Sequence, residues 1–200
     1  MTFKDCIKHR QTILVCICAF CGNIPLIFLM VTAKSFGESR GVSDFSLSIS
    51  LSIATFVNGG SRLIMGLIFN KYGTKKLLIF NFALGTIVSV SFYFAVKIEW
   101  LFCLLVILSA WQASCYVIYF SHCGHLFGSV MGGRVYSIVV AWSNLGAIFN
   151  SFISFVIVPY MGGYLSAYIF CGFMSFIGII CSFFIEEKQI IIEGEEEGKS

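Results

Sequence analysis

The residue best suited to bind a charged ligand is Arg62, the only charged side chain well inside an apolar stretch. It lies seven residues before Phe69, where that stretch ends. Seven residues span about 10 Å of helix, so the guanidinium lies nearer the middle of a bilayer than its surface. A charge at that depth costs roughly 2.5–3.5 kcal/mol on insertion scales and usually faces a polar interior. Arg62 therefore indicates a polar pathway or binding site within a membrane.

Small and polar residues share one helical face with Arg62. They recur in steps of three or four residues, the spacing of one face of an α-helix, and comprise Ser48, Ser52, Thr55, Gly59, Arg62 and Gly66. Small residues on one face more often mean close helix packing than a substrate path. The guanidinium favours the path, because packing alone does not call for a charge. Asn58 flanks this face.

Two later stretches also carry polar groups at helical spacing. The first contains Gln112, Tyr116, Tyr119 and His122, and the second contains Ser143, Asn144, Asn150 and Ser154. Such groups could hydrogen-bond a ligand, or they could bond neighbouring helices, and Tyr119 and His122 could instead lie at the membrane interface. For His122 we favour a structural role of the latter two kinds. We take the candidate substrate contacts to be Arg62, Asn58, Gln112, Tyr116, Ser143 and Asn144.

Composition places the chain in a membrane. Hydrophobic residues make up 58% of the 200 residues and charged residues only 12%, about half the share in a soluble domain. Six continuously apolar stretches are each long enough to cross a bilayer as a helix. We expect an all-α bundle of six transmembrane helices near residues 12–33, 44–69, 76–96, 99–121, 134–158 and 164–185. The bundle, 12–185, would follow a cytoplasmic segment, 1–11, and precede a solvated acidic tail, 186–200.

The first stretch contains the sequence Gly22-Asn23-Ile24-Pro25. Proline removes a backbone donor and can kink a helix. Transporters contain such breaks where the backbone lines a cavity, but a proline tolerated against neighbouring helices explains the sequence equally well.

The loops predict the orientation. With six spans, both termini lie on one side of the membrane. Nine lysines and arginines fall on that side, and three fall in the loops on the opposite side. Basic loops stay in the cytoplasm, so both termini are expected there. The sequence leaves open whether the membrane is the plasma membrane or that of an organelle.

The sequence lacks the residues that several other functional classes require. The predicted spans hold no aspartate or glutamate to orient a catalytic base, and no Gly-Lys-Ser/Thr loop could cradle a phosphate. The cysteines and histidines lack the two-pair spacing of a structural zinc site. A net charge of +3 is too small to suggest nucleic acid. We expect neither an enzyme, nor a metal, nor a cofactor.

The turn after residues 44–69 carries the most specific local motif. It reads Gly66-x-x-x-Asn70-Lys71-x-Gly73-x-Lys75-Lys76. We expect Gly66 to let helices approach, Gly73 to permit a tight turn, and the lysines to hold the turn at the cytoplasmic interface. The motif resembles the loop signature of the major facilitator superfamily, which usually has an acid where Asn70 stands.

The resemblance extends to the oxalate/formate antiporter-like branch, which includes monocarboxylate-transporter-like proteins. It rests on Asn58-Gly59-Gly60-x-Arg62, Leu126-Phe127-Gly128, Arg134-x-Tyr136 and Asn144-Leu145-Gly146-Ala147. It covers nearly the whole chain and maps onto the carboxyl-terminal six-helix half of a twelve-helix transporter. It implies that Arg62 faces a central cavity and binds a substrate carboxylate, which a guanidinium fork matches. Oxalate-type members carry a lysine where we align Ser143, so the single cation here favours a monoanion or an anion that moves together with a proton.

We therefore expect one half of a secondary transporter for small organic anions, above all monocarboxylates, working by alternating access. Its partners would be the anion, the lipid bilayer and a second six-helix half, supplied by the same gene product, a separate chain or a second copy. Two alternatives remain open. One is a non-transporting membrane protein that binds a partner through the half-to-half face, and the other is a carrier of another small solute, such as a sugar or an amino acid.

Overall fold

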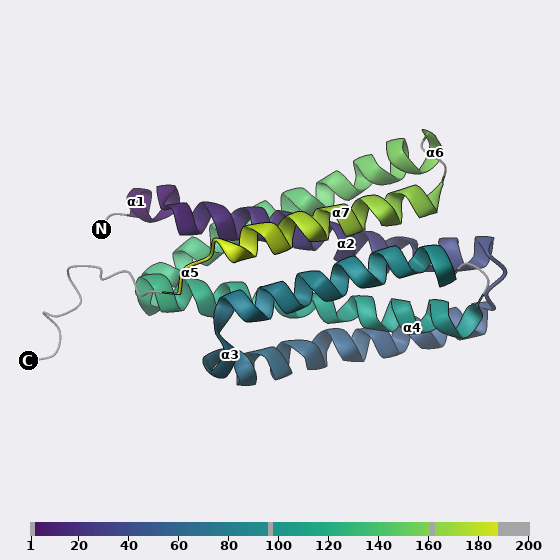
Figure 1. Cartoon of the computed structure of the whole chain (residues 1–200), viewed down its shortest axis with the longest axis horizontal. Coiled ribbons are helices and arrows are strands. Elements are labelled where there is room, and N and C mark those ends of the chain that lie inside the picture. Colours follow the sequence, from purple (N-terminus) through teal and green to yellow (C-terminus); the bar gives the residue numbers. More distant parts are fainter. Residues whose placement is uncertain (1–2, 96–97, 161–162, 188–200) are drawn as a thin grey trace, which may run out of the picture.

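The computed structural model describes residues 3–95, 98–160 and 163–187 and is a bundle of long helices (Figure 1). In this part of the chain, four helical segments are long and apolar enough to cross a membrane: Arg10–Ser39, Asp44–Ala95, Glu99–Tyr160 and Tyr164–Phe183. The first, second and fourth are α2, α3 and α7, and the short α1 (Phe3–Lys8) precedes them. The third comprises α4 (Glu99–Ser109), the 3₁₀ turn η1 (Ala110–Ser114), α5 (Cys115–Phe152), the π-helical turn η2 (Ile153–Ile157) and α6 (Val158–Tyr160). The expectation of an all-helical membrane protein is confirmed.

Two of these long segments are interrupted at a glycine. Gly73 in α3 has φ 73° and ψ 172°, and Gly128 in α5 has φ 76° and ψ 172°. Residues with a Cβ rarely adopt these angles, whereas glycine does so without steric cost. Figure 1 shows α3 turning back on itself, so its first arm holds the stretch expected at 44–69 and its second arm holds the stretch expected from residue 76, as far as Ala95.

The Gly22–Pro25 sequence does not break the first long helix. The structure keeps α2 helical from Arg10 to Ser39, with Pro25 buried inside it. Its neighbours are α5 and α7, against which most of α2 packs. Of the two interpretations, a proline tolerated by surrounding helices describes the structure.

Aromatic rings fill one end of the core. The buried ring of Tyr168 on α7 stacks on Phe92 of α3 with 4.6 Å between centroids, and lies 5.0 Å from Phe36 of α2. Phe102 of α4 packs edge-on against Phe92 at 5.3 Å. Such ring pairs add stabilisation beyond the area that they bury, so this cluster ties four helices together.

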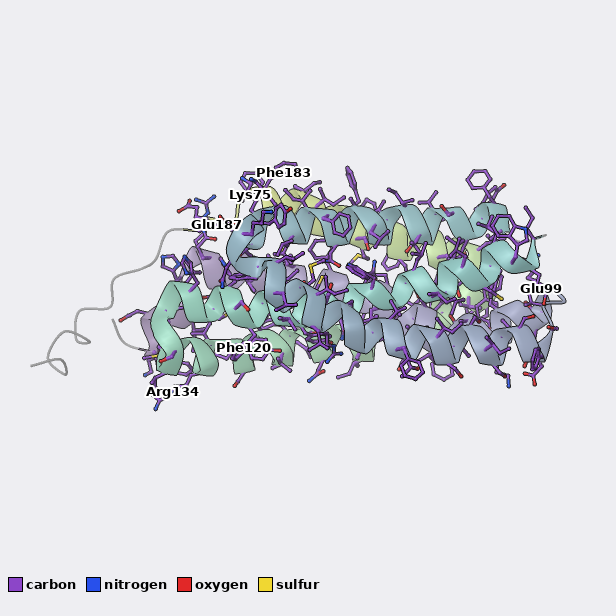
Figure 2. All side chains as sticks on the ribbon, turned by 90° about the horizontal axis from the view of Figure 1, so that it is seen from below. Lys75, Glu99, Phe120, Arg134, Phe183 and Glu187 are labelled. Atoms are coloured by element: carbon purple, nitrogen blue, oxygen red, sulfur yellow. The ribbon has the colours of Figure 1, made fainter. Side chains whose placement is uncertain are left out.

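The outside of the bundle is strongly apolar. Phe56, Leu67 and Phe155 expose 83%, 82% and 78% of their surface. Figure 2 shows Lys75, Arg134 and Glu187 at one end of the bundle and Glu99 at the other. Apolar sides between charged ends are what a bilayer requires.

Candidate functional site

Arg62 lies on the first arm of α3 and is exposed on the surface of the bundle. Its guanidinium carbon is 5.5 Å from the centroid of the Tyr116 ring, at the start of α5. Among the described residues it forms no ion pair. A guanidinium over an aromatic face keeps its donors free for a ligand while the ring partly offsets its desolvation.

The hydroxyl of Tyr116 joins Arg62 to a buried polar cluster. It donates to Asn23 Oδ1 of α2 at 2.7 Å and lies 3.0 Å from Ser143 Oγ of α5. Asn23 Nδ2 donates in turn to the backbone carbonyl of Ser143 at 2.7 Å. Asn23 and Ser143 are 3% and 1% exposed, so these bonds are made inside the bundle and hold the Tyr116 ring in place.

Three of the predicted contacts therefore form one unit with Asn23: Arg62, Tyr116 and Ser143. We call these four residues the Arg62 cluster. Sequence analysis did not select Asn23 as a contact. The available signal was an amide deep within an apolar stretch, where unpartnered polar groups are costly.

The other predicted contacts lie outside these bonds. Asn58 is half-buried one helical turn before Arg62, and Asn144 is exposed beside Ser143. Gln112 is 4% exposed and packs against Gly85, where an added Cβ would overlap its amide nitrogen. Its Oε1 has no hydrogen-bond partner among the described residues. Gln112 is thus a buried packing residue at this point of the bundle, and it shows no bond to the Arg62 cluster.

Behind the Arg62 cluster, the described residues enclose only a small space. The space lined by Gln112, Tyr116 and Ser143 measures about 10 Å³, which is about the volume that one water needs. On the other side, every residue of the small and polar face of α3 is exposed: Ser48, Ser52, Thr55, Gly59, Arg62 and Gly66. This face is open along the described part of the chain, so a ligand of Arg62 can approach from outside the bundle.

The chain turns at Gly73 of the loop motif, where the positive φ favours glycine. The backbone N–H of Lys75 donates to Glu187 Oε1 at 2.8 Å, and Lys75 Nζ donates to the carbonyl of Phe183 at 2.7 Å. A cleft of about 370 Å³ at this turn is lined by Asn70, Lys71, Lys76 and their neighbours, with His125 and Glu187. The acidic tail was expected to be solvated from Glu186 onward, but Glu187 rests on this turn; residues 188–200 lie outside the described part.

The close approach expected at Gly66 is absent. A Cβ added there would lie 3.7 Å from Val117 Cγ1, an ordinary van der Waals distance. His122, which we expected to bond a neighbouring helix or lie at the interface, is fully buried, and its Nδ1 lies 2.8 Å from Thr74 Oγ1. This bond joins the turn after Gly73 to α5.

The fold and this site define a multi-pass, all-helical membrane protein whose exposed polar face runs along one helix at the depth of the bilayer. Residues 13–199 match the model of the Major Facilitator Superfamily, and the chain belongs to this family. Among curated proteins, no match to the chain is found. Membership implies a secondary transporter of a small molecule rather than an enzyme.

Proposed function

We propose that this chain is one six-span half of a secondary transporter for small organic anions, with monocarboxylates of the oxalate/formate antiporter-like branch as the favoured class. Its second half would come from the same gene product, a separate chain or a second copy. The two halves would enclose the substrate and rock to alternate access. The glycine turns at 73 and 128 support six spans, because each divides a long helical segment in two.

One observation carries the choice of an anion. Arg62 lies exposed on an apolar bundle, stacks on Tyr116 and forms no ion pair among the described residues. A lone guanidinium at this depth is costly unless a ligand or a polar cavity receives it. A carboxylate matches its paired N–H donors and neutralises its charge.

The neighbourhood of Arg62 supports a single negative charge. Within the Arg62 cluster the other members are a phenol, an amide and a hydroxyl, and none is cationic. A dianion would keep one charge uncompensated in a medium of low dielectric constant. A monoanion fits, with Asn58 and Asn144 beside it as further contacts.

The same proposal assigns the cytoplasmic side. Lys75 and Arg134 lie at one end of the bundle (Figure 2), the end where Gly73 turns the chain and Glu187 lies. Basic residues gather on the cytoplasmic side of membrane proteins. We place this end, with both termini, in the cytoplasm.

The test is uptake of a labelled short monocarboxylate by cells that express the protein. Losing a charge-assisted hydrogen bond costs about 1.5–3 kcal/mol. At substrate concentrations below saturation, Arg62→Gln should therefore lower the uptake rate by about 10- to 100-fold. Arg62→Lys keeps the charge without the planar fork and should give an intermediate loss.

Arg40→Gln is the matched control, because Arg40 also lies over an aromatic ring, at 5.4 Å from the centroid of Phe36, but beyond the last turn of α2. It should leave uptake unchanged. Uptake by Arg62→Gln equal to that of the wild type would refute the proposal. Inhibition of uptake by sugars or amino acids would instead indicate another solute, and a change in partner binding without transport would indicate a non-transporting protein.

A further inference from the structure

An open apolar groove runs between the first arm of α3 and α4. Its volume is about 700 Å³, within the range of about 300–1,000 Å³ that is typical of ligand pockets. Its apolar walls are formed by Phe45, Ile49, Ile53, Trp100, Leu104 and Ile107. Phe45 and Trp100 expose 76% and 69% of their surface, so the described residues leave the groove uncovered. Among the described residues that line it, Glu99 alone is charged.

The groove has the depth of one lipid leaflet. Glu99 lies at the end of the bundle opposite Lys75 (Figure 2). From Glu99 to Ile107 is eight residues, about 12 Å of helix, which is close to half of the roughly 30 Å hydrocarbon core of a bilayer. Trp100, next to Glu99, presents the exposed aromatic ring that membrane proteins place at the level of the lipid head groups. Glu99 therefore lies at the head-group end of the groove.

The groove is separate from the polar face that carries Arg62. Ile53 and Arg62 are nine residues apart on the same arm of α3, which is two and a half helical turns. Their side chains therefore point to opposite sides of the helix. A second half that covered the Arg62 face would leave the groove open to the bilayer.

The carboxylate of Glu99 is held in place but not neutralised. The hydroxyl and the backbone N–H of Ser43 both donate to its Oε1, at 2.9 and 3.3 Å. Among the described residues Glu99 forms no ion pair. Asp44, the first residue of α3, is by contrast paired with Lys34 at 2.8 Å. A fixed carboxylate at the end of an apolar groove suits a cation that carries an apolar chain.

We propose that the groove binds one phospholipid of the surrounding bilayer whose head group carries a primary ammonium, as in phosphatidylethanolamine. One acyl chain lies between α3 and α4, and the ammonium donates a charge-assisted hydrogen bond to Glu99. Burial of the chain favours all phospholipids alike, so Glu99 selects the head group. A choline head group has no N–H to donate, and a serine head group adds a carboxylate that Glu99 repels.

The test is native mass spectrometry of the purified, delipidated full chain in detergent. The chain is titrated with phosphatidylethanolamine or with phosphatidylcholine of the same acyl chains, which differ only in the methyl groups on nitrogen. The ethanolamine lipid should bind at least about tenfold more tightly. Equal binding, or tighter binding of the choline lipid, would overturn the proposal. So would a dimer that excludes the lipid, because a second copy of the chain would then cover the groove.

Glu99→Gln is the matched variant, because its amide keeps an acceptor for Ser43 but has no charge. It should bind the two lipids equally. Glu38→Gln is the control: Glu38 faces Lys34 at 3.9 Å near the end of α2 and does not line the groove. It should keep the preference for the ethanolamine lipid. A preference that persists in Glu99→Gln, or that is lost equally in Glu38→Gln, would overturn the assignment to Glu99.

The position of the acyl chain is tested from both walls of the groove. Ile49→Trp and Leu104→Trp each add an indole ring that takes the space of the chain, so both should weaken the binding of both lipids. Leu67→Trp adds the same ring at a position that is 82% exposed outside the groove, and it should leave binding unchanged. Wild-type binding by both groove variants would place the lipid elsewhere and overturn the proposal.

This inference goes beyond the proposed function, and the two fail separately. Arg62→Gln should keep the preference for the ethanolamine lipid, because the groove and the Arg62 cluster share no residue. Wild-type uptake by Arg62→Gln, together with loss of the lipid preference in Glu99→Gln, would refute the proposed function and support the lipid site.

Discussion

Replacing Gly73 by alanine perturbs the turn between the two arms of α3 in two separable ways. The first is backbone strain, because φ 73° and ψ 172° are nearly closed to a residue with a Cβ. The second is steric, because an added Cβ would lie 2.6 Å from both carboxylate oxygens of Glu187. The carboxylate would have to move and give up its 2.8 Å bond to the Lys75 N–H.

The structure lets each contribution be assigned a size. Strain of this kind costs about 1–3 kcal/mol, and loss of one exposed hydrogen bond adds about 1 kcal/mol. Gly73→Ala should therefore lower the free energy of unfolding by about 2–4 kcal/mol. Gly41→Ala measures the cost of a positive φ where nothing crowds the added side chain, since Gly41 has φ 81° and no atom within 4 Å of its added Cβ.

The assay is equilibrium unfolding in mixed micelles, followed by the reactivity of the buried cysteines towards a thiol dye. Gly59→Ala serves as the unstrained control, because Gly59 lies within the helix with nothing near its added Cβ. When it is compared with Glu187→Ala alone, the double variant Gly73→Ala with Glu187→Ala should retain only the backbone strain, about 1–3 kcal/mol. An identical cost of Gly73→Ala with and without Glu187 would refute the steric part of the reasoning. If Gly73→Ala lowers the free energy of unfolding by no more than Gly59→Ala does, both the strain and the steric parts of the reasoning are refuted.

Two further substitutions test the interior of the bundle. Tyr116→Phe keeps the ring beneath the guanidinium but removes the hydroxyl that bonds Asn23 and Ser143, so we expect a loss of about 1–3 kcal/mol in unfolding free energy and a several-fold fall in uptake. Gly178→Ala should cost about 1–3 kcal/mol, because its Cβ would come within 2.5 Å of the Phe82 ring between α7 and α3.

Tyr160→Phe is the control for the first substitution, since Tyr160 is 83% exposed at the end of α6 and its hydroxyl shows no hydrogen bond among the described residues, and it should change neither quantity. Unfolding is measured as for Gly73, and uptake as for Arg62. A Tyr116→Phe protein as stable and active as Tyr160→Phe would show that the polar cluster does not position Arg62. A Gly178→Ala protein as stable as the wild type would show that α7 can move away from Phe82.

The sequence by itself determined the membrane class, the helical architecture and the place of the turn at Gly73. Long apolar runs permit only helices that satisfy their own backbone bonds in a bilayer, and Gly73 between lysines marks a turn. The sequence also singled out Arg62, because the position of this residue within an apolar stretch places a costly charge deep in the membrane.

Only the tertiary structure decided what each helical face meets. Tyr116 and Asn23 are 93 residues apart in the chain, and Asn23 and Ser143 are 120 apart, yet hydrogen bonds join them. Periodicity shows that residues share a face but not whether that face is packed or exposed. For that reason the sequence alone did not show that the Arg62 face of α3 is open or that Gln112 is buried against Gly85.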